Sequence, residues 1–220
     1  MKGREYIMEN SEKKKVNWLK EIWEWVYTIA IAVVIALLIK NFLFDIVKVD
    51  GSSMYPTLID GDRLIVSRLG YEPEYGDIVI LDSTYKDREQ YYKSVAEGDG
   101  KEELGFIGKL TTKLPQHLKK RYYVKRVIGM PGQTVDLRDG KVYIDDVLLD
   151  EEYYEGVTYP IDSNMQFPIT VEEDTVFVMG DNRPRSKDSR SSDLGLVPYD
   201  ALLGQSQFRI WPLNALGVTR

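Results

Sequence analysis

The sequence contains no cysteine and only one histidine among its 220 residues. The missing cysteines exclude disulfide bonds, thiolate metal sites and cysteine nucleophiles. The single histidine, His117, lies in the polar stretch Leu-Pro-Gln-His-Leu-Lys-Lys, which indicates a solvated loop position. A Ser-His-Asp triad or a histidine zinc site would have to use this one residue. If the chain is a hydrolase, we therefore expect its base to be a group other than imidazole.

Basic charge is also scarce, with 29 Lys and Arg against 35 Asp and Glu and a formal net charge of −6. Nucleic-acid-binding proteins usually carry a basic face, so this balance argues against a nucleic-acid partner. The length suits one globular domain plus an anchor, or one domain with a sizeable insertion. Apolar residues make up 43% of the chain, enough for a core, and the 15 Tyr and 6 Phe favour strands.

Long apolar runs are limited to one, the 15 consecutive uncharged residues from Trp25 to Ile39. Apolar flanks extend this run toward the roughly 20 residues that span a bilayer, which predicts a transmembrane helix over 22–44. A cleavable signal peptide is the first alternative, but the following Lys-Asn-Phe-Leu-Phe-Asp-Ile-Val lacks the small residues of a cleavage site. A buried core helix is the second alternative. Such a helix is usually apolar on one face only, whereas this stretch is apolar on all sides.

The charges around this helix predict its orientation. Four lysines closely precede the uncharged run from Trp25 to Ile39 and two closely follow it, namely Lys13, Lys14, Lys15 and Lys20, then Lys40 and Lys48. By the positive-inside rule, residues 1–21 should be cytoplasmic and residues 45–220 extracytoplasmic, which makes the chain a single-pass protein of the cell membrane.

Short apolar or alternating runs separated by turn signals fill the rest of the chain and predict a mainly β domain. The expected strands are 45–49, 63–67, 77–81, 122–128, 134–137, 141–144, 176–179 and 207–211. The pair Asp139-Gly140 between two of them predicts a type I′ hairpin turn. The core should be built from about 45–82, 121–131 and 175–220. Residues 83–120, rich in Lys, Glu, Asp and Gly, are expected to form a long exposed loop with room for a short helix.

A serine cluster follows the first predicted strand, in Val49-Asp-Gly-Ser-Ser-Met-Tyr-Pro-Thr-Leu58. Gly51 permits a close backbone approach, and a serine held on such a turn presents both its hydroxyl and its amide N–H to a substrate. The plainer interpretation is a serine-rich turn without chemistry.

A lysine in an apolar setting lies in Tyr122-Tyr-Val-Lys-Arg-Val-Ile-Gly-Met-Pro-Gly132. The two-residue period of a strand places Lys125 on the same face as Tyr123 and Val127. Most lysines are simply solvated. Burial, however, disfavours the charged form and lowers the lysine pKa, so that a neutral amine could accept a proton from a serine near neutral pH.

The third cluster is Met179-Gly-Asp-Asn-Arg-Pro-Arg-Ser-Lys-Asp-Ser-Arg190. It is either a charged turn or the source of a second hydroxyl, Ser186, that orients the lysine. Asp181, Asp188 and Arg190 could pair with Arg126 and support the site structurally, because buried charges need partners.

Together these clusters and Gly76-Asp-Ile-Val resemble the successive boxes of bacterial type I signal peptidases, in the family's order and after a membrane helix. With its single predicted membrane span, the chain resembles the Gram-positive members of this family. The closing Phe208-Arg-Ile-Trp-Pro-Leu-Asn is similar to the family's C-terminal strand. The resemblance implies a signal-peptidase-like β-rich catalytic core with an inserted β subdomain, here about 132–174. It covers nearly all of the chain outside 1–20 and 83–120.

Carried over by position, the resemblance implies Ser53 as nucleophile, Lys125 as general base and Ser186 as the hydroxyl that orients the lysine. It also implies shallow pockets for small side chains one and three residues before the cut. The implied substrate-binding positions are Val47, Val49, Asp50, Gly51, Met54, Leu58, Tyr123 and Val124. Some members have a serine two residues before the nucleophile that helps hold the oxyanion, whereas this chain has Gly51 there, so its oxyanion donors stay open beyond the Ser53 amide.

The predicted protein is therefore a membrane-bound serine endopeptidase that removes signal peptides from exported preproteins after Ala-X-Ala-type sequences, with no metal and no cofactor. Its expected partners are preproteins and the lipid bilayer, with the secretion translocon as a further candidate. A self-cleaving repressor-type Ser/Lys protease would need a DNA-binding region in place of the anchor, and residues 1–44 offer none. The other alternative is a catalytically inactive, membrane-tethered β-domain that serves as an interaction or assembly factor.

Overall fold

The computed structural model describes residues 18–68, 70–98 and 103–219, and divides into two compact units, 1–41 and 42–220. The first unit contains helix α1 (Trp18–Phe42), whose 25 residues begin and end slightly before the predicted span 22–44. In the part of the chain that the structure describes, no helix combines the length and apolarity needed to cross a membrane. The predicted transmembrane helix is thus not confirmed.

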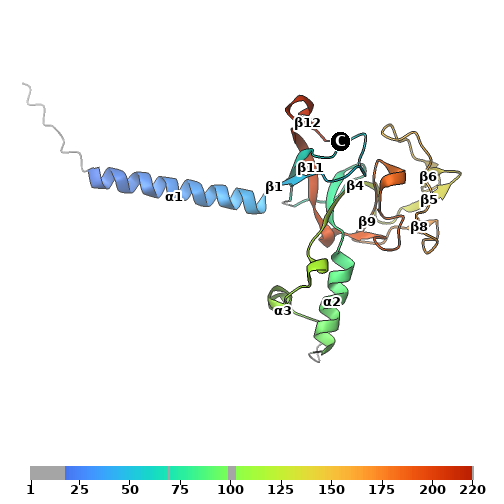
Figure 1. The fold of residues 1–220 in the computed structure, drawn as a ribbon, viewed down its shortest axis with the longest axis horizontal. Helices are drawn as coiled ribbons and strands as arrows, with labels where there is room; N and C mark the ends of the chain where they lie inside the picture. The colour runs from blue at the N-terminus through green and yellow to red at the C-terminus, as the bar shows by residue number, and fades with distance from the viewer. Residues whose placement is uncertain (1–17, 69, 99–102, 220) are drawn as a thin grey trace, which may run out of the picture. The chain divides into compact units, whose positions relative to one another are not determined.

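The second unit is mainly β, as predicted, and its strands form two antiparallel sheets (Figure 1). The larger sheet has the order β1-β2-β11-β3-β4-β9-β10, with β12 paired to β11. Its strands are β1 (Phe44–Lys48), β2 (Arg63–Ser67), β3 (Ile78–Asp82), β4 (Tyr122–Gly129), β9 (Thr175–Met179), β10 (Val197–Pro198), β11 (Leu202–Trp211) and β12 (Gly217–Val218).

The smaller sheet has the order β7-β6-β5-β8 and lies within the stretch 132–174. Its strands are β5 (Thr134–Arg138), β6 (Lys141–Ile144), β7 (Val147–Leu148) and β8 (Ile169–Thr170). Asp139 and Gly140 join β5 to β6 with φ of 51° and 75°, the positive values that a type I′ turn requires.

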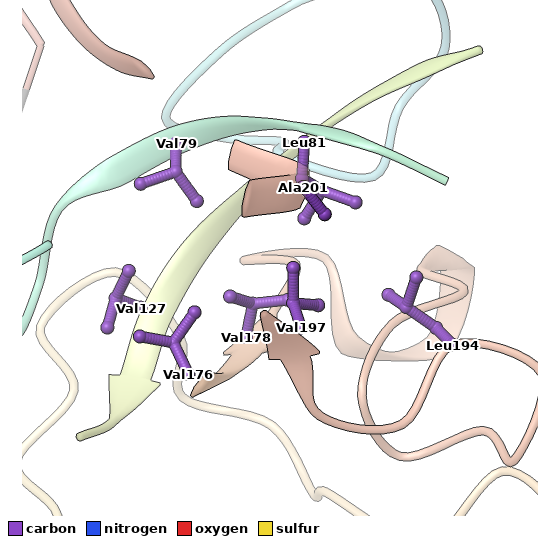
Figure 2. Packing of buried hydrophobic residues seen from close by; sticks show 8 residues of the cluster. All are labelled: Val79, Leu81, Val127, Val176, Val178, Leu194, Val197 and Ala201. Carbon is purple, nitrogen blue, oxygen red and sulfur yellow. The ribbon is translucent and has the colours of Figure 1, made fainter. Parts of the chain in front are cut away.

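Strand β3 runs through the centre of the larger sheet, and all five of its residues are buried. Val79 and Leu81 pack on one face with Val127 of β4 and with apolar side chains from 176–201, as Figure 2 shows. Ile78 and Ile80 pack on the other face, in a second cluster that includes Val49, Met54, Leu58, Leu64 and Val66. Because both faces of the sheet are covered here, the polar side chains Lys125 and Arg126 of β4 are also removed from water.

The stretch 83–120, expected as a long exposed loop, contains helices α2 (Tyr85–Gly98) and α3 (Phe106–Thr111) and the short 3-10 turn Gln116–Leu118. The buried residues of α2 are Arg88, Tyr92 and Ala96, one per helical turn. One of these three is an arginine, which pairs with Asp82 at the end of β3. A stripe this narrow, with a charge in it, gives almost no apolar periodicity, which explains why the sequence indicated a loop with room for only a short helix. His117 is exposed, as expected.

Candidate active site

Ser53 lies in the loop 49–62, which connects β1 to β2. Gly51 adopts a φ of +93°, a left-handed conformation that favours glycine, and its N–H donates to Asp60 Oδ1 at 2.9 Å. Asn182 holds the backbone of the serine through two hydrogen bonds. The Asn182 N–H donates to the Ser53 carbonyl at 3.0 Å, and its side-chain amide donates to the Ser52 carbonyl at 2.9 Å.

This clamp leaves the amide of the serine available. In the part of the chain described by the structure, the Ser53 N–H has no backbone hydrogen-bond acceptor, whereas the carbonyls of Ser52 and Ser53 are both engaged. Asn182 lies inside the third sequence cluster, but sequence reasoning assigned it no role. The signal that could have identified it is its position beside Gly180 and Asp181, in a stretch already expected to support the site.

Lys125 lies on β4 opposite Val79 of β3, and its side chain is only 2% exposed. Its Nζ lies 2.9 Å from Ser53 Oγ and donates to the Val124 carbonyl at 2.8 Å. The Tyr123 ring centroid is 5.1 Å from the same nitrogen. The structure thus brings together a serine and a lysine that are 72 positions apart in the chain.

Burial lowers the pKa of Lys125 from 10.5 to about 8, because removal from water disfavours the charged amine. The carboxylates of Asp188 and Asp181 oppose this change by attracting the cation, and Arg190 adds to it. An amine with a pKa of about 8 is roughly one-tenth neutral at pH 7, which is enough for it to act as a proton acceptor.

Ser186 is buried beside the nucleophile's backbone. A Cβ added at Gly180 would overlap both the Ser186 side chain and the Ser53 carbonyl oxygen, so glycine is needed for this close packing. Ser186 Oγ is buried and has no hydrogen-bond partner within the described ranges. The structure therefore places the third predicted catalytic residue next to the site but shows no bond from it to Lys125.

The four predicted supporting charges are all buried, in two separate pairs. Arg126 donates from Nε and Nη2 to the two oxygens of Asp181 at 2.9 and 2.7 Å. Arg190 donates in the same two-pronged way to Asp188 at 2.8 and 2.8 Å. The Asp188 carboxylate also accepts the N–H of Gly180 at 3.0 Å. Among the four predicted supporting charges, Arg126 thus pairs with Asp181, and Arg190 pairs with Asp188 within their own loop.

A cleft of about 370 Å³ opens in front of Ser53 and Lys125. Of the predicted substrate-binding residues, those that line it are Val47, Val49, Asp50, Gly51, Tyr123 and Val124. Met54 and Leu58 do not line it, because both are 1% exposed and point into the core below the loop. The lining residues that sequence reasoning missed are Lys48, Ser52, Tyr122, Arg185 and Lys187.

Two strand edges form the walls of this cleft. Among the described strands, β1 pairs with β2 and forms the edge of the larger sheet. Strand β4 pairs with β3 from Tyr122 onward but with β9 only from Arg126 onward. Within the described residues, the segment 122–125 therefore has one free edge, which can accept main-chain hydrogen bonds from an extended peptide.

Comparison with known proteins identifies the family. Residues 22–211 match the family described as "Signal peptidase, peptidase S26". The chain is 38% identical over 219 residues to signal peptidase I of Bacillus licheniformis, covering 95% of this chain and 99% of that one. It is 37% identical over 224 residues to signal peptidase I T of Bacillus subtilis (strain 168), covering 96% and 95%.

The chain thus belongs to the signal peptidase family, peptidase S26, and is a serine endopeptidase. The crystal structure of a signal peptidase I from Enterococcus faecalis V583 shares 28% identity with it. That match covers 61% of this chain and 97% of the other, with a TM-score of 0.40, a value too low to support a statement about the fold.

Proposed function

We propose that this protein removes signal peptides from exported preproteins, cutting after small residues in Ala-X-Ala-type sequences, with Ser53 as nucleophile and Lys125 as general base. The observation that carries the proposal is the 2.9 Å contact between Ser53 Oγ and an almost fully buried lysine whose pKa is lowered to about 8. The names of the relatives supply the substrate class.

In the proposed reaction, the cleavage segment lies extended between 47–50 and 122–124 and pairs with the free edge of β4. Neutral Lys125 accepts the Ser53 hydroxyl proton as Oγ attacks the carbonyl after the small residue. The Ser53 N–H, which has no backbone acceptor among the described residues, is placed to stabilise the oxyanion. Protonated Lys125 then gives its proton to the leaving amine, which completes the acyl-enzyme.

Deacylation uses the same base. A water molecule loses a proton to neutral Lys125 and attacks the acyl carbon, and the proton returns to Ser53 Oγ as the signal peptide leaves. Ser186 is proposed as the hydroxyl that orients the amine. Its support is the burial of Ser186 Oγ without a hydrogen-bond partner among the described residues. The two buried ion pairs, Arg126–Asp181 and Asp188–Arg190, are proposed to support the loop that holds Asn182 and Ser186.

The membrane anchor, the extracytoplasmic placement of 45–220 and contact with the translocon also belong to the proposal. Their support is the apolar run from Trp25 to Ile39 and the lysines before it. Alkaline extraction of membranes and protease protection of intact cells test them. Release of the full chain by alkali would reject the anchor and leave the peptidase chemistry untouched.

The activity test mixes the detergent-solubilised chain with a preprotein that carries Ala-X-Ala, and mass spectrometry locates the cut. Cleavage after the second alanine should be lost in Ser53→Ala and in Lys125→Ala, and retained in the control Lys141→Ala, an exposed lysine of β6. Ser52→Ala identifies which hydroxyl attacks: loss there, with activity kept in Ser53→Ala, would reverse the assignment. A correctly folded parent that cuts no such substrate would favour an inactive tethered β-domain.

A further inference from the structure

An exposed apolar surface lies on α3, in the insertion between β3 and β4. Phe106, Ile107 and Leu110 are 82%, 74% and 74% exposed. Their spacing places them along one side of a single helical turn. Figure 1 shows α3 beside α2. The other side of α3 faces α2, because Lys109 pairs with Glu89 at 2.7 Å and its Nζ lies 5.5 Å from the Tyr92 ring centroid.

The insertion holds this apolar turn outward. Tyr92, Ala96 and Leu104 form a small core of their own. Arg88 ties α2 to the sheet through Asp82, and both side chains are buried. Because Lys109 of α3 pairs with Glu89 of α2, this side of α3 faces α2 and the three apolar side chains stay exposed.

Positive charge follows the apolar turn in the sequence. From Leu104 to Arg121 the sequence has five basic residues and no acidic residue, in a chain whose formal net charge is −6. Four of the five are exposed, namely Lys113, Lys119, Lys120 and Arg121. No ion pair involves any of these four in the described part of the chain. The acid that directly precedes the segment is Glu103.

The insertion is joined to the sheet at a defined end. Its first and last residues meet where the Ser83 N–H donates to the Arg121 carbonyl at 2.8 Å. The strand registers at this end are Phe44↔Ser67, Ser67↔Gln205, Leu202↔Leu81 and Asp82↔Tyr122. The insertion therefore leaves the sheet at the end where strand β1 begins.

We infer that the segment 106–121 binds an anionic lipid surface, with Phe106, Ile107 and Leu110 in the interface and the four basic side chains at the headgroups. Exposed apolar side chains flanked by lysine and arginine are the combination that such surfaces attract. A protein partner is disfavoured, because three side chains fall far short of the roughly 800 Å² per partner of a stable interface. The inference rests on the proposed function only in assuming that the domain works at a membrane.

The contact would also fix the orientation of the active-site cleft. Arg121 is followed directly by Tyr122, which lines the cleft and begins the free edge of β4. A lipid contact on one side of this junction would thus hold the free edge of β4 at a constant distance from the membrane surface, beside a membrane-embedded signal peptide. Each basic side chain close to an anionic surface strengthens the contact by a factor of about five.

The absence of cysteine allows a direct test on the full chain. Ile107→Cys is labelled with a polarity-sensitive fluorophore and reconstituted into phosphatidylcholine vesicles with and without phosphatidylglycerol. The matched control is Val147→Cys in β7, also β-branched and 69% exposed. The label at 107 should shift to the blue and lose accessibility to iodide when phosphatidylglycerol is present, and the label at 147 should not.

A charge reversal separates attraction to lipid headgroups from simple burial. Lys119→Glu with Lys120→Glu removes two attracted charges and adds two repelled ones, so it should weaken the contact by at least about 25-fold and return the 107 label to water. The control Lys141→Glu, an exposed lysine of β6, should leave it protected. A 107 label equally accessible in both kinds of vesicle overturns the inference. Protection in detergent that rises with protein concentration also overturns it, in favour of contact between copies.

Cleavage of a preprotein in the same vesicles keeps the two proposals distinguishable. Intact cleavage with a water-accessible 107 label rejects the lipid contact and leaves the proposed function standing. A protected 107 label in a parent that cuts nothing rejects the proposed function and supports the lipid contact.

Discussion

Lys125→Met should remove activity and stabilise the protein at pH 7. The lysine pKa falls from 10.5 to about 8 in the folded state, mainly through burial. At 1.36 kcal/mol per unit, burying this amine costs about 3 kcal/mol at any pH below 8. Methionine keeps the unbranched stem and carries no charge. It gives up the contacts to Ser53 Oγ and the Val124 carbonyl, each worth about 1 kcal/mol. The net expectation at pH 7 is a gain of roughly 1–2 kcal/mol.

The sign of this gain should change with pH. Between about 8 and 10.5 the unfolded chain holds a proton that the folded chain has lost, so the free energy of unfolding of the parent rises with pH across this window. The methionine variant lacks this rise. Its advantage should therefore shrink above pH 8 and become a deficit near pH 10.5, where only the lost hydrogen bonds remain.

Urea unfolding of the detergent-solubilised chains, followed by near-ultraviolet circular dichroism at several pH values, measures the difference. Equal m-values for parent and variant are the condition for comparing them. Lys141→Met, at an exposed lysine, serves as the matched control and should show no pH-dependent difference. A stability difference at Lys125 that stays constant from pH 7 to pH 10 would refute the lowered pKa.

Three further predictions concern the same site. The value of kcat/KM should rise about tenfold per pH unit and level off near pH 8, because the neutral form of Lys125 is the base; a plateau reached by pH 6 would point to another base. Asn182→Ala removes the 2.9 Å bond to the carbonyl before the nucleophile and should lower kcat about tenfold with little change in KM, and a change confined to KM in steady-state kinetics would contradict this. Asp181→Ala leaves Arg126 buried without its carboxylate and should cost about 3–5 kcal/mol in urea unfolding, against less than about 1 kcal/mol for the exposed Asp193→Ala; equal costs would show that the buried pair has no special role.

Local chemistry made much of this protein predictable. The mainly β fold follows from strand periods that span only a few residues, and the Asp139-Gly140 turn follows from the backbone freedom of these two residue types. Because the chain has no cysteine and its one histidine lies in a polar stretch, composition alone favoured a base other than imidazole. Four motifs in a fixed order then indicated the family, and the comparisons show it.

Helix α2 was not predictable in the same way. Its buried stripe contains Arg88, whose burial depends on Asp82 at the end of a neighbouring strand. A residue pattern records polarity but not the partner that neutralises a charge. For the same reason the sequence could name four supporting charges but not their pairing, which the folded loop divides into Arg126–Asp181 and Asp188–Arg190.

The sequence by itself determined which residues could carry the chemistry, because residue type and strand period are properties of short segments. The tertiary structure alone decided that Met54 and Leu58 point into the core and that Asn182 holds the backbone of Ser53. It also decided that Lys125 loses its water and meets a serine 72 positions away. Burial and long-range contact depend on how distant segments pack, and a pKa depends on both.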